Sequence, residues 1–327
     1  MSSTILILHS TLQPGAGPDE QDTLDAVRDV TAALESEGFI AAAAGFVPDL
    51  DAVRATVAAH RPACVFNLVE SVEGRSDLVH LAPAFLDAIG VPYTGCTAET
   101  LLLTGDKIAA KRIMAAAGLP TAPWWEDPAA VPEGRRAIVK HRIEDASFGL
   151  DAGAVVTGPR AAAQRAAAMR AGKGPGWFAE AFLPGREFNV SVIETAAGPR
   201  ALPVPEMRFD GLPEDVPPIL GYAAKWAEAS AEYEGTRRRF VAGEDALCAS
   251  LQDLALRAWA LFGATGAIRV DLRLDPGGVP HVLEVNANPG IGPEGGLQAA
   301  CAETGITYRA MVRGLVDAAF ARAERQR

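Results

Sequence analysis

The stretch that most constrains the fold runs from 266 to 290 and reads GAIRVDLRLDPGGVPHVLEVNANPG. Polar and apolar residues alternate on both sides of the turn at 275–278, a pattern that predicts two antiparallel strands joined as a hairpin. Side chains of opposite character then point to opposite faces: Arg269, Asp271 and Arg273 to one, Val270, Leu272 and Leu274 to the other. We therefore expect a hairpin with one core face and one polar face.

Three oxygen-bearing side chains share the polar face of this hairpin. In the expected register Asp271 lies opposite Val282 and on the same side as Glu284 and Asn286, with the Asp271 and Glu284 Cβ atoms diagonal at roughly 7 Å. A merely solvated face is the alternative, but Glu284 stands in the apolar run VLEV, where an unpaired carboxylate would be costly. We therefore expect a hard cation between the carboxylates.

Length, charge and cysteine usage exclude several classes of protein. The 327 residues suffice for about two domains with a substantial core. A net charge of −11 disfavours nucleic-acid and anionic-membrane partners, and no window has the ~18 consecutive apolar residues of a membrane helix. The cysteines lack disulfide or zinc spacing and predict reduced thiols in the cytoplasm: Cys64, Cys96, Cys248 and Cys301.

The first 96 residues alternate strand and helix patterns. Strands are expected at 4–9, 40–44 and 63–68, with helices at 23–37 and 50–60. This alternation predicts a parallel sheet whose ligands gather in the loops after His9 and Leu68. Without a GxGxxG motif a dinucleotide site is disfavoured.

The loop after Leu68 is densely polar and includes Glu70 and Arg75. A substrate-contacting loop and a solvated surface loop were equally favoured by these residues alone.

Two lysines in the middle of the chain lie next to backbone segments that could bind phosphate. Lys107 lies in the first turn of a helix that Gly118 and Pro120 close, where a cation is unfavourable unless an anion binds; an exposed lysine at small cost is the alternative. Lys140 ends a strand at 137–140 and precedes the small-residue loop 144–150, which could close over phosphates.

A second hairpin is expected at 177–194, with Glu180 before its turn and Glu187 after it. The stretch 207–239 has weak periodicity, typical of a functional or disordered loop, and holds Lys225 and Trp226. Helices at 244–263 and 296–324 complete the chain.

In their order and spacing these elements resemble the ATP-grasp superfamily, and within it the D-alanine:D-alanine ligase group, over essentially the whole chain. The resemblance rests on short motifs that would each be weak alone: Phe66-Asn67, Pro92-Tyr93-Thr94-Gly95, Asp106-Lys107, Val139-Lys140, EAFLPGRE at 180–187, LPVPE at 202–206, Lys225, Arg269-Val270-Asp271, LEVN at 283–286 and Pro289-Gly290.

The resemblance implies a mixed α/β (α+β) ATP-grasp fold in two domains. The N-terminal parallel-sheet domain would span 1–96 and the ATP-grasp domain 97–327. Within the latter, a central subdomain of about 110–185 and a C-terminal subdomain of about 186–327 would clamp ATP.

The resemblance also assigns ATP-site roles. Lys107 and Lys140 would contact phosphates and the adenine pocket, and Glu180 the adenine amino group. The backbone of Ala181, Phe182 and Leu183 would face the adenine edge, and Glu187 the ribose hydroxyls. Asp271, Glu284 and Asn286 would ligate two Mg²⁺ ions, with Mn²⁺ as an alternative. Arg269 and Lys225 would stabilise the transferring phosphoryl group and the oxyanion, and the loop at Ser147 would exclude water.

This sequence departs from the family in the amino-acid pockets. Glu70 replaces a histidine, Arg75 and Ser76 an acidic pair, Ala146 a serine, Trp226 a tyrosine, and Gly295 with Gly296 a serine region. The glycine-rich N-terminal signature is absent, leaving Glu20 and Asp22 as loose candidates for an amine-binding acid. We therefore expect altered substrate contacts from Glu70, Arg75, Trp226, Gly290 and Gly295.

The expected activity is ATP-dependent ligation of a small-molecule carboxylate to an amine through an acyl phosphate, with ADP and phosphate released and substrates other than two D-alanines. Alternatives are a true D-alanine:D-alanine ligase, an enzyme that cyclises or phosphorylates one substrate, and a nucleotide-binding module without catalysis. The resemblance further implies a homodimer.

Overall fold

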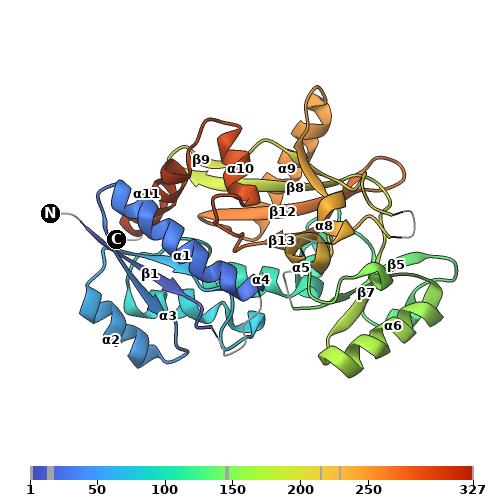
Figure 1. Cartoon of the computed structure of the whole chain (residues 1–327), viewed down its shortest axis with the longest axis horizontal. Coiled ribbons are helices and arrows are strands. Elements are labelled where there is room, and N and C mark those ends of the chain that lie inside the picture. The colour runs from blue at the N-terminus through green and yellow to red at the C-terminus, as the bar shows by residue number, and fades with distance from the viewer. Residues whose placement is uncertain (1–2, 13–17, 144–146, 214–215, 228–229, 326–327) are drawn as a thin grey trace.

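The computed structural model describes residues 3–12, 18–143, 147–213, 216–227 and 230–325. Three sheets follow one another along the chain, coloured blue, green, and yellow to orange in Figure 1. With the helices between them, these sheets give the mixed α/β architecture that the sequence predicts. In the described ranges, no helix combines the length and apolarity needed to cross a bilayer.

The N-terminal sheet is parallel, as the alternation predicts, with the order β2-β1-β3. Its strands are β1 (Thr4–His9), β2 (Ile40–Gly45) and β3 (Cys64–Leu68), and its helices are α1 (Pro18–Ser36), α2 (Leu50–His60) and α3 (Leu81–Ile89). Helix α1 begins earlier than expected, so Glu20 and Asp22 belong to a helix and not to a loop.

The second sheet has four strands in the order β4-β7-β5-β6. It consists of β4 (Trp124–Trp125), β5 (Arg136–His141), β6 (Val155–Thr157) and β7 (Trp177–Ala181). The helix α6 (Gly158–Lys173) packs Ala162, Ala166 and Met169 against this sheet. Two helices connect it to the first sheet: α4 (Ala98–Gly105) and α5 (Lys107–Ala116).

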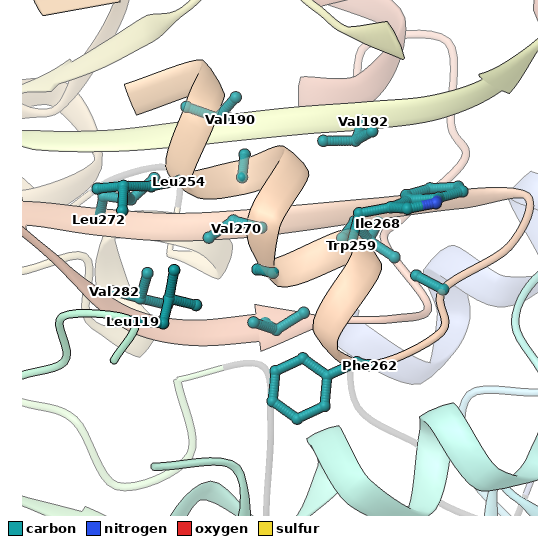
Figure 2. Packing of buried hydrophobic residues seen from close by; sticks show 14 of the residues in the cluster. Leu119, Val190, Val192, Leu254, Trp259, Phe262, Ile268, Val270, Leu272 and Val282 are labelled. Atoms are coloured by element: carbon teal, nitrogen blue, oxygen red, sulfur yellow. The ribbon is translucent and has the colours of Figure 1, made fainter. Parts of the chain in front are cut away.

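The third sheet has the order β11-β10-β8-β12-β13, with β9 paired to β8. Its strands are β8 (Glu187–Thr195), β9 (Gly198–Ala201), β10 (Pro205–Arg208), β11 (Arg237–Phe240), β12 (Ala267–Leu274) and β13 (Pro280–Asn286). Figure 2 shows α9 (Asp245–Leu261) packed on one face over Val190 and Val270. The closing helices α10 (Gly296–Ala302) and α11 (Tyr308–Arg325) pack with Ile193 and Ala267 in a separate core cluster.

Short elements complete the chain. The stretch from 207 to 239 contains α7 (Tyr222–Trp226) and α8 (Ala231–Gly235) besides β11, so it is more regular than the sequence predicts. These elements of four or five residues are too short to show a periodic pattern. Three 3₁₀ turns lie at Ser76–Leu78, Pro128–Ala130 and Ala152–Ala154.

The hairpin predicted at 177–194 is wrong. Strand β7 pairs with β4 and β5, whereas β8 pairs with β9, β10 and β12 in the other sheet. Gly185 lies in the segment that connects the two sheets, and its N–H donates to Leu274 O at 3.1 Å. Only glycine fits this close approach, because an added Cβ would lie 2.4 Å from that oxygen. Alternation predicted two strands, but it does not specify with which neighbours they pair.

The register predicted for the β12–β13 hairpin is also wrong, by one residue next to the turn and by two residues at Asp271. Asp271 lies directly opposite Glu284, and Val282 lies opposite Leu272, with a bulge between the two pairs. The bulge lets both Val282 and Val285, three residues apart, enter the same core. It also turns the predicted diagonal carboxylate pair into a direct cross-strand pair.

Candidate functional site

A pocket lies between the four-stranded and six-stranded sheets. Residues from both sheets, from α5 and from three loops line it: Lys107, Ile138, Lys140, His141, Ser147, Phe148, Leu150, Glu180, Ala181, Phe182, Leu183, Glu187, Ile219, Leu220, Asp271, Arg273, Leu283 and Glu284. Ten of these were singled out from the sequence for ATP, metal or catalytic roles: Lys107, Lys140, Ser147, Glu180, Ala181, Phe182, Leu183, Glu187, Asp271 and Glu284.

One end of the pocket is apolar and is suited to a flat ring. Ile138, Phe182 and Ile219 form a small buried cluster there. The N–H of Ala181 donates to Pro123 O at 2.8 Å and that of Phe182 to Arg136 O at 3.1 Å. Those two N–H groups already donate within the protein, so the N–H of Leu183 is the donor of this stretch that could meet the edge of a base.

A buried charge cluster adjoins this end. Glu180 is 1% exposed and pairs with Lys140 at 2.8 Å and with Lys111 at 2.5 Å. Burial alone would raise the pKa of Glu180, but Lys111 and Lys140 hold that pKa below its usual value. Burial alone would lower the pKa of Lys140, but Glu180 and Glu284 outweigh burial and raise it. Lys140 therefore remains a cation at the pocket wall.

Sequence reasoning missed Lys111. The residue lies four positions after Lys107 on α5, among the buried Ile108, Ala110 and Met114. A lysine within an apolar helical stripe was the available signal. Its Nζ also donates to Thr121 Oγ1 at 3.0 Å, and Thr121 donates to Val282 O at 2.8 Å. Lys111 therefore links the helix to the strands on both sides of the pocket.

Asp106 positions Lys107 by capping α5. Its Oδ1 accepts from the N–H groups of Ile108 and Ala109 at 3.0 and 3.1 Å, while Arg142 donates to both of its oxygens. Burial alone would raise the pKa of Asp106, but Arg142 and the two amides lower it. The first turn that carries Lys107 is thus anchored to the end of β5.

We expect Asp106→Asn to lower the free energy of unfolding by about 1 kcal/mol at pH 7, because the partly exposed pair with Arg142 loses its charge while the cap is retained. The folded pKa lies below 3.8. The difference from wild type should therefore be complete above that value and shrink as the pH falls through the folded pKa. Urea unfolding at pH 7 and pH 3 measures it, and a constant difference would contradict the charge assignment.

The polar face of β12 and β13 lies at the other end of the pocket. Asp271 is 7% exposed and accepts from Arg269 Nε at 2.7 Å, Arg269 Nη2 at 2.8 Å and Asn189 Nδ2 at 2.8 Å. Asn286 lies opposite Arg269, outside the pocket lining, and its Oδ1 accepts from Asn288 N at 3.0 Å. Asn189, the partner of Asp271 on β8, is a further residue at this end of the pocket.

The donor set at this end fits a hard cation. Asp271 and Glu284 face each other directly, which places their Cβ atoms about 4.5 to 5.5 Å apart. Carboxylate and amide oxygens are the ligands that Mg²⁺ prefers. Over the described part of the chain, no group of three or more His, Cys, Asp or Glu residues could hold a metal, so this pair with an amide is the candidate.

Two loops join over the pocket. Ser147 has a positive φ of 63°, and its Oγ donates to Leu220 O at 2.7 Å. Tyr222 N donates to Leu150 O at 3.0 Å. A non-glycine residue in this backbone region costs of order 1 kcal/mol or more, so the contact between the loops stabilises it. Ala146 lies outside the described residues, as do the side chains of Lys225 and Trp226 on α7.

The predicted amino-acid contacts lie away from this lining. The N–H groups of Glu70 and Ser71 both donate to Ser10 Oγ at 2.9 Å, and Asn288 Nδ2 donates to Val69 O at 3.1 Å. The loop after β3 therefore contacts the loop after β13, the strand that carries Glu284. Ser10 and Asn288 were missed from the sequence.

Arg75 donates two hydrogen bonds to Asp77, at 3.1 and 2.6 Å. These bonds are the main reason why the pKa of Asp77 is lowered. Gly295 caps α10, and its carbonyl accepts from Arg238 at 3.1 Å, while Gly290 is exposed. These three residues do not line the pocket.

Comparison with known proteins gives one consistent result. The family model described as D-ala D-ala ligase C-terminus matches residues 136–317. A D-alanine--D-alanine ligase from Acidiphilium cryptum is 31% identical over 321 residues, 96% of this chain and 98% of the relative. An uncharacterized protein y4sG from Sinorhizobium fredii is 31% identical over 268 residues, 79% and 75% of the two chains.

Solved structures show the same fold. The crystal structure of a D-alanine--D-alanine ligase from Bacillus anthracis complexed with ATP has a TM-score of 0.76 over 100% of both chains at 15% identity. A ligase structure from Coxiella burnetii has a TM-score of 0.70 at 15% identity, covering 99% of this chain and 97% of that one.

Proposed function

The chain belongs to the D-alanine:D-alanine ligase family of ATP-grasp enzymes and is an ATP-dependent, ADP-forming ligase; from that premise we propose that it joins a small carboxylate to an amine through an acyl phosphate. The observation that carries the proposal is the pocket with an apolar end and a carboxylate end. Lys107 and Lys140 line the same pocket, and Lys140 interacts with both Glu180 and Glu284, so a triphosphate would meet these two cations.

The apolar end suits adenine and the carboxylate end suits Mg²⁺. We assign the base to the wall of Phe182 and Ile219, the ribose to Glu187, and the phosphates to Lys107 and Lys140. Asp271, Glu284 and Asn286 would hold Mg²⁺, or Mn²⁺ in its place, and the bound ion would neutralise charge on the phosphates.

In the first step a carboxylate oxygen of the substrate attacks the γ-phosphorus of ATP, and ADP leaves. Two anions approach each other in this step, so fixed cations lower its barrier. We assign Arg269 and Lys225 to this role. Arg269 lies on the strand that carries Asp271 and is already oriented by it through two hydrogen bonds.

In the second step the amine attacks the carbonyl carbon of the acyl phosphate, and the tetrahedral intermediate expels phosphate and loses a proton. Water would hydrolyse the acyl phosphate, so the site must exclude it. The contact between Ser147 and Leu220 closes loops over the pocket and supports this assignment.

The substrates proposed here differ from two D-alanines, although relatives carry the name D-alanine--D-alanine ligase. Glu70 would face a cationic group of the substrate. Trp226, Arg75, Gly290 and Gly295 would contact the substrate or shape the loops around it. The alternative is a true D-alanine:D-alanine ligase. Cyclisation or phosphorylation of a single substrate would use the same first step. Only the products distinguish these reactions from ligation of two substrates.

A panel of carboxylates and amines tests the proposal. We expect ATP-dependent phosphate release with selected pairs and a product heavier than either substrate by mass spectrometry. D-alanyl-D-alanine as the best product would overturn the altered-substrate proposal. ATP binding with no turnover on any pair would favour a nucleotide-binding module.

A homodimer and a cytoplasmic location are also proposed, from the family resemblance and the cysteine pattern. The four cysteines are free, and Cys64, Cys96 and Cys301 are buried. Burial raises the pKa of Cys64 and of Cys96 to about 12, which keeps these thiols protonated and unreactive.

A further inference from the structure

Arg273 is a buried pocket residue to which the proposed chemistry gives no role. It lies two positions after Asp271 on β12, on the same face, and is 4% exposed. Arginine is almost never this buried without partners. Its contacts therefore indicate what it does.

The guanidinium group contacts three residues from two separate segments at the pocket wall. Its Nε donates to Gly185 O at 3.0 Å, and its Nη2 donates to Pro218 O at 2.6 Å. Its Nη1 lies 3.3 Å from Glu187 Oε2, with side-chain exposures of 5% for Arg273 and 8% for Glu187. Arg273 and Glu187 are direct cross-strand partners on β12 and β8.

The guanidinium group of Arg273 also lies over the ring of Phe182. The Arg273 Cζ atom lies 4.9 Å from the centre of the Phe182 ring, and the Arg136 Cζ atom lies 4.4 Å from the same centre. A planar guanidinium that stacks on a ring and donates in fixed directions is held more rigidly than an ammonium group. Two backbone carbonyls and the rings of Phe182 and Phe209, the latter at 5.9 Å, thus hold Arg273 before any ligand binds.

The rigid cation of Arg273 favours the ionised form of the Glu187 carboxylate and limits its orientation. Glutamate has three rotatable bonds and is costly to bury as an anion without a cation beside it. An ionised carboxylate only accepts hydrogen bonds, which is what a pair of ribose hydroxyls requires.

We propose that Arg273 is a positioning residue that orients Glu187 toward the ribose hydroxyls and thereby sets the preference of the enzyme for ribonucleotides over deoxyribonucleotides. The inference rests on the proposed function in placing the ribose at Glu187. It adds a determinant of nucleotide selectivity that lies behind the contacting residue.

Binding of ADP and 2′-deoxyADP to the full chain with Mg²⁺, measured by titration calorimetry, tests the proposal without a ligation substrate. Wild type should bind ADP about tenfold more tightly than 2′-deoxyADP, as expected for one charge-assisted hydrogen bond. In Arg273→Met the affinity for ADP should fall by about that factor, and the ratio of the two affinities should approach one.

Two variants serve as controls. Arg136→Met removes the other guanidinium on Phe182 without touching Glu187 and should keep the wild-type ratio. Arg273→Lys keeps the charge but loses the planar group, so its ratio should lie between wild type and Arg273→Met. If Arg273→Met fails to fold by circular dichroism, Arg273→Lys carries the test.

An unchanged ratio in Arg273→Met, with both affinities lowered equally, would overturn the proposal and leave a structural role. Equal binding of both nucleotides by wild type would overturn it as well. Failure of the ligase proposal gives a different result, because phosphate release would be absent while the binding ratio of wild type remained.

Discussion

Asp271→Asn is expected to lower kcat/KM for MgATP by about 100- to 1,000-fold, the loss that follows removal of one preorganised electrostatic group. Asparagine keeps the size of the side chain and an oxygen that can accept from Asn189, so the strand should remain folded. The charge that faces Glu284 across the strands is lost. Cation binding between the two strands should weaken accordingly.

Initial rates of phosphate release at varied Mg²⁺ measure this loss, and the Mg²⁺ concentration for half-maximal rate should rise. Asp210→Asn is the matched control. Asp210 pairs with Arg208 two residues away by two bonds of 3.0 Å, as Asp271 pairs with Arg269, but it is exposed and outside the pocket. Wild-type ATP consumption in Asp271→Asn would contradict the metal assignment.

Lys111→Met is expected to lower the free energy of unfolding by about 3 kcal/mol, because it removes one partner of a buried ion pair and leaves Glu180 with a single cation. The hydrogen bond to Thr121 is lost with it. The affinity for ATP should also fall, since Glu180 then draws Lys140 away from the pocket.

Urea unfolding monitored by circular dichroism measures the stability, and calorimetry with ADP measures the affinity. Thr121→Val separates the two contacts, because it keeps the ion pair and should cost only about 1 kcal/mol. Lys111→Met/Glu180→Gln should recover part of the loss, since both charges are removed together. No difference between Lys111→Met and Thr121→Val would show that the buried ion pair contributes nothing.

Much of the pocket lining could be predicted because its signals are local. Period-2 alternation placed Asp271 and Glu284 on strands, and glycine and proline punctuation located the helix that begins at Lys107. The departures from the family pattern at Glu70 and Trp226 were equally visible. Their contacts were not, because they depend on loops from separate parts of the chain.

The sequence by itself determined the order of strands and helices, the apolar and polar faces of β8, β12 and β13, and the family. These properties follow from the repeat of each backbone geometry and the burial of apolar side chains, which act over a few residues. The parallel N-terminal sheet followed from the same rules.

Only the tertiary structure decided that β7 and β8 part into different sheets and that a bulge sets Asp271 opposite Glu284. Only it identified Lys111 and Arg273 as buried partners of Glu180 and Glu187. The sequence does not show whether a charged side chain will contact solvent or a buried carboxylate. Its environment depends on segments far apart in the chain, whose contacts form only when the sheets pack together.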